Sequence, residues 1–113
     1  YGDAGWLAHT NHYLSPSMQA LEEPGAYASS HVRLNRVRRL LKETLGRVTV
    51  EGLQAILRDH VNYPNSVCGH QDPKDPPYER DMTIVSLVMD LTEQVMWAAP
   101  GPPCEGEYVA YRL

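Results

Sequence analysis

The feature that most constrains the fold is a pair of strand-like runs near the end of the chain, joined by a short turn. Residues 83–90 read TIVSLVMD and residues 95–99 read VMWAA, both rich in the β-branched and apolar side chains that favour strands. The intervening residues 91–94, LTEQ, predict the turn of a hairpin. Residues 107–112 predict one more strand, so the sequence predicts an antiparallel set of three strands.

Two amphipathic helices are predicted before these strands. A serine at position 29 or 30 caps the first, which runs to about Leu45 and ends at Gly46, a residue type common after helix ends. Thr49 is the predicted N-cap of the second helix, residues 50–60. The apolar stripe of the first helix consists of Val37, Leu40, Leu41 and Leu45, and the second buries Leu53, Ile56, Leu57 and His60.

Residues 6–14, WLAHTNHYL, predict a first strand that Pro16 ends, because proline cannot donate to a ladder. Alternation places Asn11 on the face shared by Leu7 and His9, where a buried amide must be satisfied or used. Its N–H groups can donate to a carbonyl oxygen that becomes negative during acyl transfer. Alternatively, this asparagine bridges two backbone segments where the strand ends.

A strand, two helices and then antiparallel strands predict an α+β fold with the helices covering one face of the sheet. The 113 residues suit one domain, and 42% hydrophobic residues exclude a disordered chain. Between the first strand and the first helix, residues 15–29 predict a loop with a turn at residues 22–25. Because the chain opens on Tyr1 without a methionine, we expect residues 1–113 to be a partial domain that is incomplete at its N-terminus.

The charge of the chain argues against nucleic acid or membrane partners. Its formal net charge is -4, and no run approaches the ~20 apolar residues that cross a bilayer. We therefore expect a soluble, cytoplasmic protein, and two cysteines outside any C-x-x-C pair fit a reducing compartment. Arg33 could tie the first helix to a neighbouring loop. The basic residues of that helix are expected to form a solvated face: Arg33, Arg36, Arg38, Arg39 and Lys42.

Residues 61–79 form a long predicted loop, and such loops are often functional. Within it, Cys68 lies two residues from His70, either as a nucleophile pair or as a small buried thiol beside a turn glycine. Cys104, after Pro-Gly-Pro-Pro, is expected in a loop or at a sheet edge. Five residues are possible zinc ligands: His9, His12, His60, Cys68 and His70. Their spacing matches no familiar zinc pattern, so the sequence predicts no metal and no other cofactor.

Arg80 stands just before the strand that begins near residue 83, where strand ends commonly present functional groups. A guanidinium there can hold a substrate carboxylate or bias a nearby thiol toward thiolate. The alternative is an exposed arginine paired with Glu79 or Asp81, which contributes little energy.

Together these pieces resemble the C-terminal part of the autoproteolytic cysteine acyltransferases related to isopenicillin N acyltransferase. The likeness spans nearly the whole chain, and the HTNH run at residues 9–12 is its most specific part. The later pieces occur in the order of the family: Ser29-Ser30-x-x-Arg33, Asp59-His60, Val67-Cys68-x-His70, Arg80-x-x-Thr83, Gly101-x-Pro103-Cys104 and Tyr111-x-Leu113.

The resemblance implies an N-terminal-nucleophile (Ntn) hydrolase with an αββα sandwich. Its precursor cleaves itself before a cysteine, whose thiol attacks an amide or thioester carbonyl while the freed α-amino group acts as base. The resemblance puts Asn11 at the oxyanion hole and Arg80 near the nucleophile, which would lie upstream of this segment and leave it inactive alone. It implies as partners a small-molecule amide or acyl-CoA-type substrate, the rest of the precursor and a possible oligomer.

Two alternatives remain open on the residues alone. One is a non-catalytic binding domain of α+β class that uses the long loop and the polar end of the first strand. The other is a self-contained thiol enzyme that uses Cys68 and His70.

Overall fold

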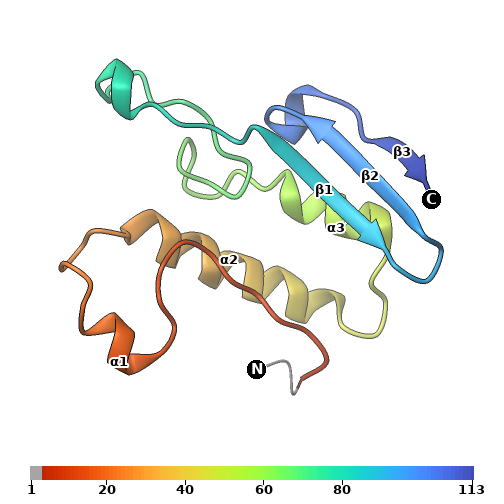
Figure 1. The fold of residues 1–113 in the computed structure, drawn as a ribbon, viewed down its shortest axis with the longest axis horizontal. Coiled ribbons are helices and arrows are strands. Elements are labelled where there is room, and N and C mark those ends of the chain that lie inside the picture. The colour runs from red at the N-terminus through yellow and green to blue at the C-terminus, as the bar shows by residue number, and fades with distance from the viewer. Residues whose placement is uncertain (1–3) are drawn as a thin grey trace.

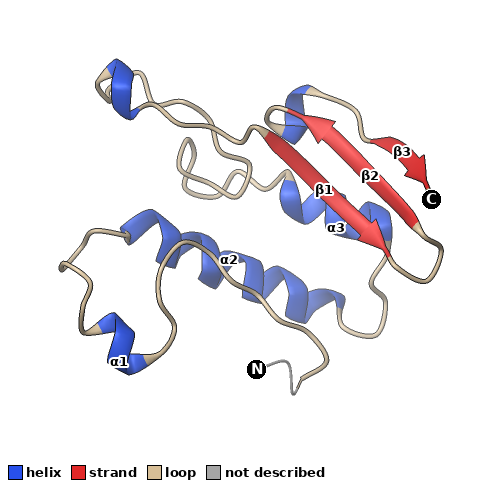
Figure 2. Ribbon diagram, in the orientation of Figure 1, coloured by secondary structure: helices blue, strands red, loops and turns tan. Residues whose placement is uncertain are grey.

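A computed structural model describes residues 4–113 and shows helices followed by an antiparallel sheet, as Figures 1 and 2 show. This order confirms the α+β class. The elements are α1 Pro16–Gln19, α2 Ala28–Thr44, α3 Val50–Leu57, β1 Val85–Asp90, β2 Val95–Pro100 and β3 Val109–Arg112, with short 3-10 turns η1 Pro77–Glu79 and η2 Pro103–Glu105. Over the part of the chain that the structure describes, no helix combines the length and apolar character needed to cross a membrane.

The sheet has the strand order β1-β2-β3, with both neighbouring pairs antiparallel. The predicted hairpin is confirmed, with Val88 opposite Trp97. β1 begins at Val85 instead of Thr83, because the Thr83 N–H donates to the carbonyl of Gly69 in the preceding loop, at 3.1 Å. This bond attaches the long loop to the start of the sheet.

The two faces of the sheet differ in what covers them. On the inner face, Val88, Val95 and Ala99 are buried, and α3 packs against β1. α2 in turn packs against α3, so α3 provides the main helical cover that the sequence predicted for both helices. The opposite side, here called the outer sheet face, is apolar and open to solvent along much of its length: Val85, Leu87, Met89, Met96, Ala98, Val109 and Tyr111.

Both long helices form where the apolar periodicity predicts them. α3 begins at the predicted cap, since the Thr49 hydroxyl accepts from the Gly52 N–H at 2.9 Å. Gly46 has φ +78°, a left-handed conformation that favours glycine and ends the path of α2. α3 stops at Leu57 instead of His60, because its end tightens into i to i+3 bonds such as Asp59 N–H to Ile56 O, 3.1 Å.

An ion pair connects the two long helices. The Arg36 guanidinium donates to both Asp59 carboxylate oxygens, at 3.0 and 2.8 Å. These hydrogen bonds hold the pKa of Asp59 below its usual range. The polar face of α2 is therefore not simply solvated as predicted: Arg36 is half-buried and fixes the residue that precedes His60.

Residues 6–14 do not form the predicted strand: over residues 4–113, the sheet contains β1, β2 and β3. The segment is irregular and runs beside α2 (Figure 1). Its polar groups bond to the first turn of that helix, with Thr10 Oγ1 donating to Ser30 O at 3.0 Å and Asn11 N donating to Ser30 Oγ at 2.7 Å. Asn11 is exposed and not buried, which corrects the expectation from alternation.

One short helix lies inside the predicted loop 15–29. α1 is a single turn with Pro16 at its first position, where the missing N–H is not needed. The predicted turn that follows is confirmed, with Ala26 N–H donating to Glu23 O at 3.1 Å.

Candidate functional site

The side chain of Asn11 is held in a defined orientation by α2. Arg33 Nη2 donates to Asn11 Oδ1 at 2.8 Å, which confirms the expectation that Arg33 ties the helix to a neighbouring segment. An asparagine offers one acceptor oxygen and one NH₂ donor group. Because the guanidinium occupies the oxygen, the NH₂ group of Asn11 is the end left to face a ligand.

The backbone on either side of Asn11 is anchored by buried polar contacts. Ser30 Oγ accepts from the Asn11 N–H and lies 2.7 Å from His12 Nδ1. His12 is 3% exposed, and its ring stacks on His31 with centroids 3.6 Å apart. The prediction that Ser29 or Ser30 caps α2 is wrong, because the N-cap residue of this helix is Tyr27 and Ser30 lies in the first turn. The contacts of Ser30 and His12 were not predicted, although both residues belong to the pieces of the chain that carry the family likeness. Their contacts fix the position of Asn11 relative to the first turn of α2.

His12 should make the stability of the chain depend on pH. Burial lowers the pKa of His12 below the 6.5 that is usual for histidine, and the neighbouring His31 lowers it further. The folded state therefore binds a proton on His12 less well than the unfolded state does. The free energy of unfolding should be at its full value above about pH 6.5 and should decrease as the pH drops below that value. We expect urea unfolding midpoints to decrease over this interval, and the decrease to be smaller in His12→Gln. An equal slope in the variant would assign the dependence to other groups.

Asn11 lies at the junction of two open clefts. The first has a volume of about 230 Å³ and is lined by Asn11 and Arg33 together with residues of the long loop and Thr83. The second, of about 470 Å³, is lined by the same two side chains and by apolar residues such as Val37 and Leu57. A polar and a more apolar cleft therefore meet at one oriented amide. Loop 61–79, predicted to be functional, supplies much of the polar wall.

Thr83 fixes the loop wall of the first cleft. Gly69 N donates to Thr83 Oγ1 at 2.9 Å, and the Thr83 N–H returns a bond to the Gly69 carbonyl. A Cβ at position 69 would lie 3.3 Å from Thr83 Oγ1, closer than most side-chain contacts. The glycine thus permits the close approach that brings Cys68-x-His70 next to Arg80-x-x-Thr83, two of the pieces on which the family likeness rests.

Arg80 lies outside both of these clefts. Its Nε and Nη2 donate to the backbone carbonyls of Asp75 and Pro73, each at 2.9 Å, so the side chain closes its own loop. These partners differ from Glu79 and Asp81, the carboxylates that the sequence offered. Asp81 itself lines the first cleft beside Asn11. Asp81, the residue after Arg80, therefore lies at the site, whereas the Arg80 guanidinium does not. The role of Arg80 stays a prediction.

The thiol of Cys68 is buried and poorly suited to nucleophilic attack. Cys68 is 0% exposed, and burial raises the pKa of its thiol to about 11. A thiol reacts as the thiolate, which is scarce at neutral pH when the pKa is this high. His70 Nε2 lies 3.5 Å from Cys68 Sγ, so the two side chains do meet, but the arrangement fits a buried thiol better than an activated one.

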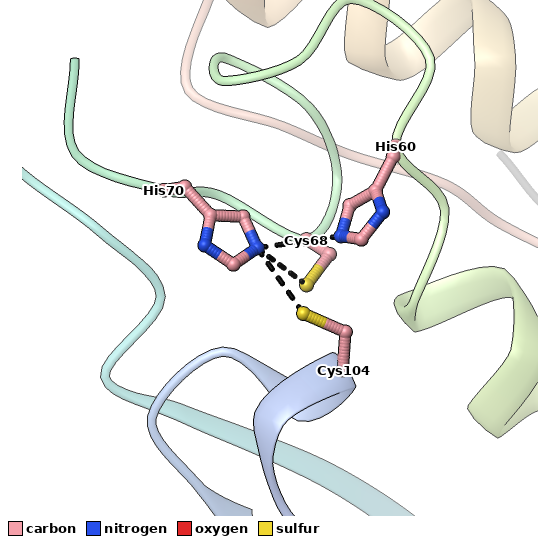
Figure 3. A group of neighbouring side chains, drawn as sticks. All are labelled: His60, Cys68, His70 and Cys104. Carbon is pink, nitrogen blue, oxygen red and sulfur yellow. Dashed lines mark hydrogen bonds between the residues drawn. The ribbon is translucent and has the colours of Figure 1, made fainter.

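Two further side chains meet the same imidazole. His70 Nε2 lies 3.2 Å from Cys104 Sγ and 3.3 Å from His60 Nε2 (Figure 3). Cys104 is exposed and lies in η2, between β2 and β3, which confirms its predicted place in a loop. This cluster was not predicted, because the two cysteines lie far apart in the sequence and in different surroundings. His9 and His12, two other possible ligands, lie outside the cluster.

The chain is α+β, and the carboxamide of Asn11, oriented by Arg33, lies at two open clefts. Comparison with known families makes the class definite: the model of the family described as acyl-coenzyme A:6-aminopenicillanic acid acyl-transferase matches residues 2–104. The chain belongs to this acyltransferase family. A search of curated proteins found no match to the chain.

Proposed function

We propose that this chain is the C-terminal segment of an N-terminal-nucleophile cysteine acyltransferase or amide hydrolase, with its nucleophilic cysteine upstream of Tyr1. The substrate is a small-molecule amide or an acyl-CoA-type thioester. Asn11 supplies an oxyanion-hole donor. The observation that carries this proposal is the 2.8 Å bond from Arg33 Nη2 to Asn11 Oδ1, which orients the carboxamide at the mouth of two clefts. Family membership supports the type of reaction.

The proposed chemistry assigns Asn11 a task during attack on the carbonyl. The upstream thiolate adds to the carbonyl carbon, the π electrons move to oxygen, and the oxyanion accepts a hydrogen bond from the Asn11 NH₂ group. When the C–N or C–S bond breaks, the leaving group takes a proton from the α-ammonium group of the nucleophile, and an acyl-enzyme thioester remains. Water or an acceptor amine then releases the acyl group. A preorganised amide donor of this kind contributes about 3 kcal/mol of barrier lowering.

Arg80 is proposed as an active-site arginine near the nucleophile. The present contacts of its guanidinium are backbone carbonyls of its own loop, at 2.9 Å. Because the side chain is exposed, one face remains open to a further partner. In the complete acyltransferase, the proposed role of Arg80 is to orient an anionic substrate group or to stabilise the thiolate.

The outer sheet face supports a role in a larger αββα sandwich. Leu87 and Met89 are 43% and 61% exposed, although strands of this composition normally pack. The radius of gyration of 15.4 Å also exceeds the roughly 13 Å expected of a compact domain of this length. In an αββα sandwich, two sheets pack face to face. We propose that a second sheet, from the rest of the precursor, covers this face and carries the nucleophile.

Self-processing of the longer chain tests the proposal. We expect a precursor that includes upstream sequence to cleave itself and expose an N-terminal cysteine, which intact-mass analysis and labelling by an alkylating thiol reagent would identify. Peptide mapping of the label is the control, because Cys68 is buried and should stay unlabelled in the folded protein. A folded precursor that never processes would contradict the proposal. A label that falls on Cys68 and abolishes turnover, without a new N-terminal cysteine, would instead assign the nucleophile to this chain.

A further inference from the structure

Four side chains from two distant parts of the chain converge on one point. His60, Cys68 and His70 come from the loop after α3, and Cys104 comes from η2 (Figure 3). Each offers one nitrogen or sulfur atom, and these atoms all lie within 4.8 Å of one another. They include the only two cysteines of the sequence, neither of which the proposed acyl transfer uses.

Three of the six separations among these atoms are close to the edge lengths of a metal-binding tetrahedron. With Zn–S near 2.3 Å and Zn–N near 2.0 Å, tetrahedral angles place ligand atoms about 3.3 to 3.8 Å apart. The three separations that meet at His70 Nε2 are 3.2, 3.3 and 3.5 Å. Hydrogen bonding alone explains them less well, because one imidazole nitrogen cannot serve three partners at once.

We propose that His60, Cys68, His70 and Cys104 form a structural Cys₂His₂ zinc site. Two thiolates balance the charge of Zn²⁺, so the complex is neutral, which suits the buried position of Cys68. All four positions of the tetrahedron are filled by protein, as in structural sites, with none left open for a catalytic water. The inference does not depend on where the nucleophile of the proposed acyl transfer lies.

The surroundings hold the ligands in place before any metal binds. The carbonyl of Asp59 accepts from the Cys68 N–H at 3.0 Å, and that of Pro64 accepts from the His70 N–H at 2.9 Å. Arg58 Nε donates to Pro103 O at 3.0 Å, which joins the segment before His60 to the residue before Cys104. The two ligand-bearing segments are therefore already linked next to the cluster.

A carboxylate also lies behind one ligand. Glu105 Oε1 is 3.6 Å from His70 Nδ1, the ring nitrogen opposite the one that faces the cluster. Metal-bound histidines commonly direct their second nitrogen to a carboxylate, which orients the ring and increases its basicity. The zinc site would tie the loop that lines the first cleft to η2, and so hold the cleft wall against the sheet.

Metal content and cobalt substitution test the proposal on the complete chain. Protein prepared without chelator should contain one zinc per chain by plasma mass spectrometry. Co²⁺ should replace zinc with the intense visible bands of tetrahedral coordination and a thiolate-to-cobalt charge-transfer band. Cys104→Ser and His60→Ala, both at exposed positions and therefore expected to fold, should lose stoichiometric zinc and these bands. Glu105→Gln should weaken binding about 10- to 100-fold.

His9→Ala is the matched control, since it removes an exposed imidazole outside the cluster and should leave zinc binding unchanged. Three results would overturn the proposal. The first is protein without zinc that also fails to give a tetrahedral cobalt spectrum. The second is zinc binding unaltered in Cys104→Ser. The third is a Cys68–Cys104 disulfide in protein prepared with zinc present, detected as the absence of free thiols under denaturing conditions.

Discussion

Asn11→Ala is expected to lower the turnover number of the mature acyltransferase by about 10²- to 10³-fold, as the loss of one oxyanion-hole donor does in other enzymes. The Michaelis constant should change little, because the hydrogen bond strengthens as negative charge develops on the carbonyl oxygen. The exposed position of Asn11 makes a folding defect unexpected. Single-turnover acylation kinetics measure the effect directly, and Asn35→Ala, an exposed asparagine on α2, is the matched control.

A companion variant separates donation from positioning. Arg33→Ala leaves the amide in place but removes the 2.8 Å bond that orients it, so we expect a smaller loss of turnover than in Asn11→Ala. Combining the two changes should cost little more than Asn11→Ala alone, because both act through one amide. Unchanged acylation in Asn11→Ala would exclude the oxyanion role, whatever Arg33→Ala does.

The elements that the sequence predicts well are those whose pattern is local. The hairpin follows from two apolar runs separated by four residues, and its register follows from that short connection. α3 begins at Thr49 because a cap needs only its own first turn. Such signals involve residues a few positions apart, so no knowledge of the tertiary structure is needed to find them.

The prediction for residues 6–14 is wrong for a physical reason that lies outside the segment. Alternation can suggest a strand, but a strand exists only where a neighbour accepts its backbone bonds. Here Thr10 and Asn11 donate instead to Ser30 in the first turn of α2, 20 and 19 positions away. Family resemblance and amide chemistry together point to Asn11 as a site residue, whereas its orientation by Arg33 depends on the fold.

The histidine–cysteine cluster was missed because its parts are far apart in the sequence. His70 and Cys104 are 34 positions apart, whereas familiar zinc motifs place at least two ligands within a few residues of each other on each side. The proline-rich turn before Cys104 brings it back to the loop after α3, a return that composition alone does not indicate. Cys68 and Cys104 both occur among the residues of the family likeness, which was the available signal.

Leu87→Glu is expected to leave the 113-residue chain folded but to disable the complete acyltransferase. Leu87 is 43% exposed on the outer sheet face, so in this chain the new carboxylate stays hydrated and costs no more than about 1 kcal/mol. Under a second sheet it would be buried without a partner, at a cost of several kcal/mol. In the longer precursor, the variant should therefore unfold at a lower temperature and should not process itself.

Leu91→Glu, in the hairpin turn and 84% exposed, is the control that should keep both the unfolding temperature and self-processing of the parent protein. Normal processing of Leu87→Glu would show that no second sheet covers this face.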